Sequence, residues 1–95
     1  MSALAEREAA AVSDALRAIA GCLRHLACGY GLMAAERAAA IAILAAGIPG
    51  TDAAALAAAA KILRSSRRLS SRRRDEASAL SLRFAAATET LDTRS

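Results

Sequence analysis

The chain has 95 residues, which is room for one domain, and 29 of them are Ala. Ala is the strongest helix former, while the residues that strands favour are scarce, with one Val, one Phe, one Tyr and no Trp. The composition therefore predicts an all-α fold and argues against a β or mixed domain. The net charge of +4 does not describe a uniformly basic protein, because six of the thirteen basic residues fall between Arg64 and Arg74.

The first predicted helix spans about residues 3–28. Its large apolar residues follow one another at alternating steps of 4 and 3, the spacing of a coiled-coil seam. This seam consists of Val12, Leu16, Ile19, Leu23, Leu26, Tyr30 and Met33. Either Gly29 or Gly31 can end the helix in the left-handed conformation, so we expect a turn over about 29–32.

The second and third predicted helices cover about 33–46 and 52–68. Gly47 and Pro49 follow the second helix, and both residue types are typical of helix ends. Thr51 or Asp52 can cap the third helix, because a hydroxyl or carboxylate accepts a hydrogen bond from the unsatisfied backbone N–H groups of the first turn.

The Arg-rich connection 64–74 separates the third helix from a fourth, predicted over about 73–90. Ser is unfavourable inside helices and neighbouring Arg side chains repel one another, so we expect a turn or a frayed segment near 65–71. Together the elements predict three to four antiparallel helices arranged as two helical hairpins, about 3–46 and 52–91. The alternative is one long helix over 52–91, which would leave a three-helix protein.

The sequence also indicates a cytoplasmic protein without a membrane span. Residues 1–10 carry charges where a signal peptide needs an apolar core, and the longest apolar run contains Pro49 and is too short to cross a bilayer. On one helix, Cys22 and Cys28 would lie too far apart for a disulfide. Free thiols fit a reducing compartment.

His25, the single His of the chain, is a candidate for signalling chemistry. On the seam's heptad it points away from the apolar stripe, and Gly29 follows four residues later. This pattern resembles histidine-phosphotransfer domains, in which a small residue leaves the imidazole open to attack. Cys28, however, stands where that family prefers Lys or Arg. Phosphotransfer through His25 is therefore one alternative function, and a solvated surface His is the competing interpretation.

The remaining chemistry of the sequence points away from an enzyme. Cys22, His25 and Cys28 could offer three metal ligands, but a closed structural site needs a fourth, and the chain has no further Cys or His. No nucleophile–base arrangement and no Gly-rich phosphate loop are recognisable. We expect no metal, no cofactor and no enzymatic activity.

The basic patch is the second group of candidate residues. It could be a solvated face, a docking site for an acidic protein, or a site for phosphates of nucleic acid or anionic lipid. No aromatic residue stands beside it in the sequence to stack on bases, so nucleic-acid binding is a further alternative rather than the leading function. The patch consists of Arg64, Arg67, Arg68, Arg72, Arg73 and Arg74.

Across most of its length the chain resembles a tetratricopeptide-type array of helical hairpins. Small, apolar and helix-ending residues fill comparable roles, although their spacing departs from the repeat's pattern; these are Gly21, Leu26, Tyr30, Ala38 and Pro49. Among small proteins of this kind, the chain is similar to the tetratricopeptide-like chaperones of bacterial type III secretion systems. The resemblance implies a cytoplasmic chaperone that holds an aggregation-prone secretion subunit in a groove.

The expected function is that of a non-enzymatic helical adaptor or chaperone. Buried Ala residues remove little apolar area from water, so a small helical domain of this composition gains stability from a partner protein or a second copy. An apolar helical groove is the binding mode that suits the seam. The predicted partner-binding residues are Leu16, Ile19, Leu23, Leu26, Tyr30, Ile41 and Leu44. The same residues could instead form only the intramolecular core.

Overall fold

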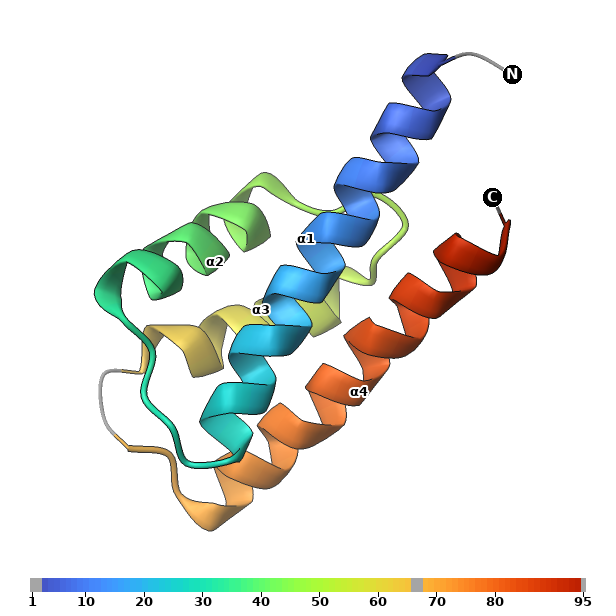
Figure 1. Ribbon diagram of the computed structural model, residues 1–95. Coiled ribbons are helices and arrows are strands. Elements are labelled where there is room, and N and C mark those ends of the chain that lie inside the picture. Colours follow the sequence, from blue (N-terminus) through green and yellow to red (C-terminus); the bar gives the residue numbers. More distant parts are fainter. Residues whose placement is uncertain (1–2, 66–67, 95) are drawn as a thin grey trace.

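The computed structural model describes the backbone of residues 3–65 and 68–94, and the side chains of residues 5–65 and 68–91. Within these ranges the chain forms four α-helices: α1 (Ala3–Ala27), α2 (Ala34–Ala46), α3 (Ala53–Arg64) and α4 (Ser71–Arg94) (Figure 1). The predicted all-α fold is confirmed. The limits of α1 and α2 nearly match those predicted, whereas α3 ends earlier than expected and α4 extends further at both ends.

The single long helix over 52–91 does not form. Helix α3 ends at Arg64, after which Ser65 is extended, and residues 68–70 are also non-helical. Helix α4 then begins with a cap from Ser70, whose Oγ accepts a hydrogen bond from the backbone N–H of Arg73 at 3.3 Å. This Ser cap explains why α4 begins ahead of the acidic pair at 75–76 that was expected to mark its first turn.

Two other helix ends follow the predicted chemistry. Gly29 has φ of 87°, a left-handed conformation that Gly adopts without strain, and its N–H donates to the carbonyl of Leu26 at 3.1 Å. Asp52 caps α3 by accepting a hydrogen bond from the N–H of Ala54 at 3.1 Å. The other carboxylate oxygen of Asp52 lies 3.3 Å from Arg83 of α4, so this cap also links two helices.

Helices α1 and α4 make the most extensive contact in the fold. They run antiparallel, so that the first turn of α1 and the last turn of α4 lie at the same end of the molecule (Figure 1). Helices α2 and α3 form a second pair. The sequence predicted hairpins of neighbouring helices, but the α1–α2 and α3–α4 contacts are smaller. The two longest helices therefore pair with each other rather than with their neighbours in the sequence.

The core lies between these two pairs. Its largest fully buried side chains are Leu16, Ile19, Leu23, Leu63 and Phe84. Small buried residues, including Ala59 of α3 and Ala77 of α4, lie among them and allow the helices to approach closely. The buried face of α4 also carries Ser81, whose Oγ donates a 2.9 Å hydrogen bond across to the carbonyl of Ala20 in α1. A buried hydroxyl is tolerated at this contact because it has a partner.

Candidate functional site

Most residues of the predicted partner-binding seam are covered by the chain's own helices. Leu16, Ile19, Leu23 and Leu44 are buried, while Leu26 and Ile41 are half-buried and pack against the same cluster. They form the intramolecular core, which the sequence left open as the alternative. Tyr30 differs from this group, because α1 ends at Ala27 and the Tyr30 side chain is 67% exposed. The prediction that the helical seam continues to Tyr30 was wrong, while its part in partner binding stays a prediction.

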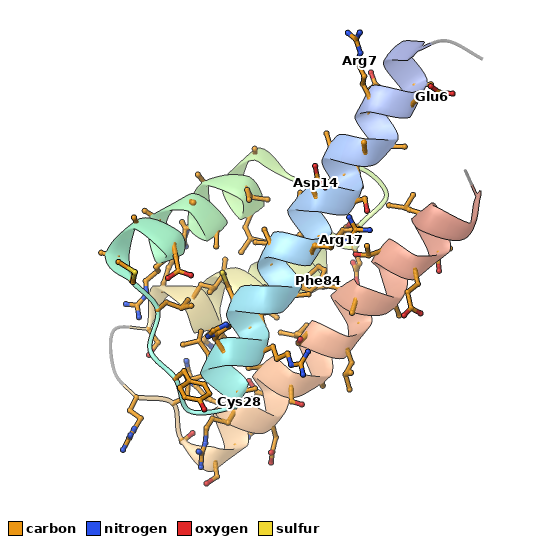
Figure 2. All side chains as sticks on the ribbon, in the orientation of Figure 1. Glu6, Arg7, Asp14, Arg17, Cys28 and Phe84 are labelled. Atoms are coloured by element: carbon orange, nitrogen blue, oxygen red, sulfur yellow. The ribbon has the colours of Figure 1, made fainter. Side chains whose placement is uncertain are left out.

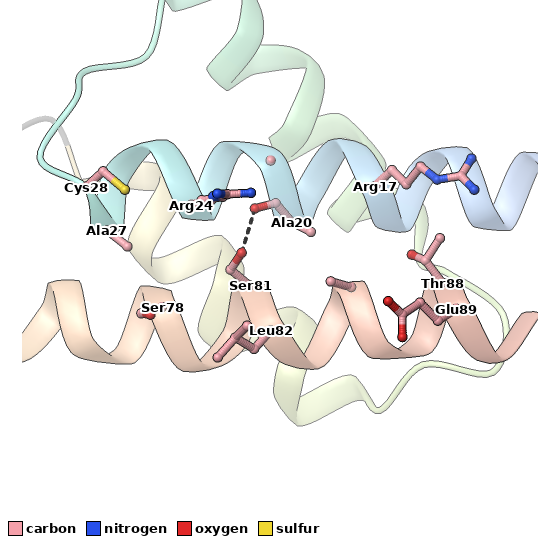
Figure 3. Close-up of a pocket in the computed structure, with 12 residues that line it drawn as sticks. Arg17, Ala20, Arg24, Ala27, Cys28, Ser78, Ser81, Leu82, Thr88 and Glu89 are labelled. Carbon is pink, nitrogen blue, oxygen red and sulfur yellow. Dashed lines mark hydrogen bonds between the residues drawn. The ribbon is translucent and has the colours of Figure 1, made fainter.

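The structure instead has an open groove of about 720 Å³ between α1 and α4. Figure 3 shows the two helices side by side with the groove residues along them. Most of the residues that line the groove have small side chains. Those of α1 and of the turn that follows it are Arg17, Ala20, Gly21, Arg24, Ala27 and Cys28. The residues of α4 are Ser78, Ser81, Leu82, Ala85, Thr88 and Glu89.

Three features give this groove its chemical character. Leu82 is a large apolar side chain that is 71% exposed, so it offers contact area to a partner. Arg17 and Arg24 stand along the α1 side, and Glu89 lies on α4 (Figure 3). The groove thus combines an exposed apolar side chain and small residues with charged residues of both signs, a composition that occurs at protein-binding surfaces.

Sequence reasoning missed this groove because it followed the large apolar residues. The sequence did contain a signal for the groove, which is a second stripe of small residues beside the seam, with Gly21 and Cys28 one heptad apart. A matching stripe on α4 has Ser78 and Ala85 one heptad apart. Small residues on two long helices let the backbones approach and leave shallow space above them. That pattern does not identify the helix that packs against α1.

A second, smaller hollow of about 360 Å³ lies between α1 and α2 and brings together Cys22, His25 and Glu36. Burial raises the pKa of the Cys22 thiol, and the carboxylate of Glu36 raises it further. Among the side chains that the structure describes, those of residues 5–65 and 68–91, no three His, Cys, Asp or Glu are grouped as metal ligands would be.

His25 is exposed, as the heptad predicted, and lies at the end of α1. Its ring packs edge-on against Tyr30, with ring centres 6.1 Å apart. Gly29 lies beyond the last turn of α1, so it is not placed beneath the imidazole by a continuing helix. Asp14, on the same helix, lies 3.7 Å from Arg17 as an exposed ion pair. The local geometry therefore favours the interpretation of His25 as a solvated surface residue.

The two thiols should differ in reactivity. We expect iodoacetamide to label Cys28, which is exposed, faster than Cys22 at neutral pH, because a raised pKa leaves less of the nucleophilic thiolate. Raising the pH should speed the labelling of Cys22. The same rise in pH should slightly lower the free energy of unfolding, because the folded state holds the Cys22 thiol proton more tightly than the unfolded chain does. Single-Cys variants, Cys22→Ser and Cys28→Ser, followed by mass spectrometry, measure the two rates. Equal rates in the folded protein would contradict the placement of Cys22, whereas equal rates in denaturant are expected.

The basic patch lies at the end of the molecule where α1 ends and α4 begins (Figure 1). Of its six predicted residues, Arg67 is outside the described residues. Arg64, Arg68, Arg72 and Arg74 are exposed, and Arg73 is half-buried.

Two further findings concern membrane insertion and similarity to known proteins. Among the helices that the structure describes, none combines the length and the hydrophobicity needed to cross a membrane. Comparisons with protein-family models, curated proteins and solved structures find no match for the chain. The resemblance to tetratricopeptide-like chaperones therefore remains a prediction.

Proposed function

We propose that the protein is a non-enzymatic helical adaptor or chaperone that binds an amphipathic helix of a partner protein in the α1–α4 groove. The observation that carries this proposal is the groove itself, with its floor of small side chains and Leu82 exposed along it. An apolar helix face laid into such a groove is a recurrent mode of protein recognition.

A helix fits the shape of the groove better than an extended strand does. The α1 side of the groove runs from Arg17 to Cys28, about 16 Å at the rise of an α-helix, which matches about three turns of a bound helix. The small residues in the middle, such as Gly21 and Ala85, can receive large apolar side chains as knobs. The backbone of α1 and α4 is already hydrogen-bonded within each helix and offers no free edge for a strand.

The charge at the groove selects the chemistry of the partner. Arg24, which lines the α1 side, favours acidic residues on the flank of the partner that meets α1. Partners of this chemistry include an aggregation-prone subunit of a type III secretion system, the class that the resemblance implies, in the cytoplasm. A second copy of the chain is the other occupant that the sequence allows.

The test compares two variants that add the same charge at equally exposed apolar residues. Leu82→Glu places a carboxylate in the groove, while Met33→Glu places one in the α1–α2 connection; both residues are 71% exposed. Affinity capture from the native cell extract, followed by mass spectrometry, should identify a protein retained by the wild type and by Met33→Glu but not by Leu82→Glu. With that protein purified, Leu82→Glu should raise the Kd by about tenfold or more, equivalent to at least about 1.4 kcal/mol.

Three outcomes would count against the proposal. One is a homogeneous monomer, by native mass spectrometry, that retains no protein. Another is a partner that both variants bind equally well, because the groove would then not be its site. A third is a retained partner that lacks any helical segment with an apolar face. Native mass spectrometry also separates a complex with a different protein from a homo-oligomer.

A further inference from the structure

The basic end of the molecule consists of Arg64, Arg68, Arg72, Arg73 and Arg74. These residues come from the last turn of α3, the connection and the first turns of α4. Arg72 lies 3.9 Å from Glu76, but its side chain is 91% exposed, so this pair holds the guanidinium weakly. The N-terminus of the long helix α4 adds the positive end of its dipole at the same place. The basic end is therefore suited to an anionic ligand.

An exposed aromatic residue directly follows the residue that one of these Arg side chains reaches, although it is far from the Arg cluster in the sequence. The guanidinium of Arg74 reaches the α1–α2 connection, where a Cβ added at Gly29 would lie 3.6 Å from Arg74 Nη1. The next residue is Tyr30, with a side chain 67% exposed. The Arg cluster thus has the stacking residue that the sequence around it lacks.

Tyr30 is also held in place. Its backbone N–H donates a 2.9 Å hydrogen bond to the carbonyl of His25, and the two rings meet edge to face at 61°. A ring fixed in this way loses little conformational freedom when a flat ligand stacks on it. Cations and an exposed, oriented ring together are the two components of sites for single-stranded nucleic acid.

We propose that the basic end binds single-stranded nucleic acid, with Arg74 and its neighbours on the phosphates and Tyr30 stacked on a base. In a duplex the faces of the bases are covered by their neighbours, so a lone exposed ring adds nothing there without unstacking. An acidic protein or an anionic membrane would be attracted by the same Arg residues but has no need of the ring face. This site is separate in chemistry from the α1–α4 groove and does not depend on its occupant.

The experiment measures fluorescence anisotropy with fluorescein-labelled oligo-U and oligo-dT over a series of salt concentrations. Affinity for these strands should exceed that for a duplex of equal length, and it should fall with salt, by about 0.7 in the log–log slope per phosphate contacted. Comparing the affinities for the two strands shows whether RNA or DNA is preferred. Equal affinities would support recognition of the phosphates and base faces that both strands share.

Four variants separate stacking from charge. Tyr30→Ala should weaken binding by about tenfold, whereas Tyr30→Phe, which keeps the ring, should bind nearly as the wild type does. Arg74→Gln should weaken binding and reduce the salt slope by about 0.7. The matched control is Arg7→Gln, which removes the same charge from the exposed first turns of α1, at the opposite end from Cys28 (Figure 2). Circular dichroism checks that each variant remains helical.

Several results would overturn the proposal. They are a lack of salt-dependent binding to either strand, an unchanged affinity of Tyr30→Ala, and an equal loss in Arg7→Gln and Arg74→Gln. Tighter binding to polyglutamate would assign the basic end to an acidic protein instead. Tighter binding to vesicles containing phosphatidylserine would assign it to a membrane surface.

Discussion

Phe84→Ala should lower the free energy of unfolding by about 3–5 kcal/mol. Phe84 is the single Phe of the chain, its side chain is 1% exposed, and it lies on the side of α4 that faces α1 (Figure 2). Removing the ring loses its transfer free energy and leaves a cavity. The surrounding core consists of packed Leu and Ile side chains and of Ala residues too short to reach into the space, so relaxation offsets only part of the loss. A domain of this size has only about 5–15 kcal/mol in total.

Urea denaturation followed by circular dichroism measures this change. Leu82→Ala is the matched control, because Leu82 lies two residues earlier on the same helix and is 71% exposed. It should change stability by no more than about 0.5 kcal/mol. An equal loss in the two variants would mean that helix propensity or residual structure, rather than burial, sets the effect at Phe84. The Phe84 variant should also retain the slope of the transition if the native state stays compact.

The helices could be predicted from the sequence because their signals are local. The 4-and-3 spacing from Val12 onward located α1, and Gly47 marked the end of α2. Asp52 was one of two predicted caps and is the one that caps α3. The start of α4 was less well predicted, because Ser70 supplied a cap within a stretch in which several Ser residues were equally suitable.

The pairing of helices could not be predicted in the same way. An apolar stripe identifies the face of a helix that is buried, but not the helix that covers it. Helix α4 shows the difficulty, since its buried face includes Ala77, Ser81 and Thr88, which carry little hydrophobic signal. Thr88 satisfies its hydroxyl within the helix, by donating to the carbonyl of Phe84 at 3.0 Å. Small and polar residues of this kind become core residues only once α1 lies against them.

The candidate surfaces could be predicted from the sequence only where they depend on a single helix. His25 was correctly predicted to be exposed, because its exposure follows from one helix. The groove needs two helices, and the basic end needs the α1–α2 connection to lie beside the start of α4. Tyr30 and Arg74 therefore belonged to separate interpretations in the sequence, one as a seam residue and the other as part of a basic patch. The approach of the Arg74 guanidinium to Gly29, where an added Cβ would lie 3.6 Å from Arg74 Nη1, is what places them in one surface.

Ala77→Leu should destabilise the protein by about 1–3 kcal/mol, although Leu is more hydrophobic than Ala. Ala77 is fully buried on α4, one turn before Ser81, whose hydrogen bond to Ala20 marks the close contact of α4 with α1. A Leu side chain there has no space, so either its rotamer is strained or the helices separate. Separation would lengthen the Ser81–Ala20 hydrogen bond and widen the groove above it.

Ala79→Leu is the control for this change, because Ala79 is exposed on the same helix and the substitution is chemically identical. It should alter the free energy of unfolding by no more than about 0.5 kcal/mol. Urea denaturation of the two variants tests the packing argument directly. If Ala77→Leu were as stable as Ala79→Leu, the helices would not be in close contact at this point. The groove would then lose its physical basis, since its shallow floor depends on α1 and α4 being held together by small side chains.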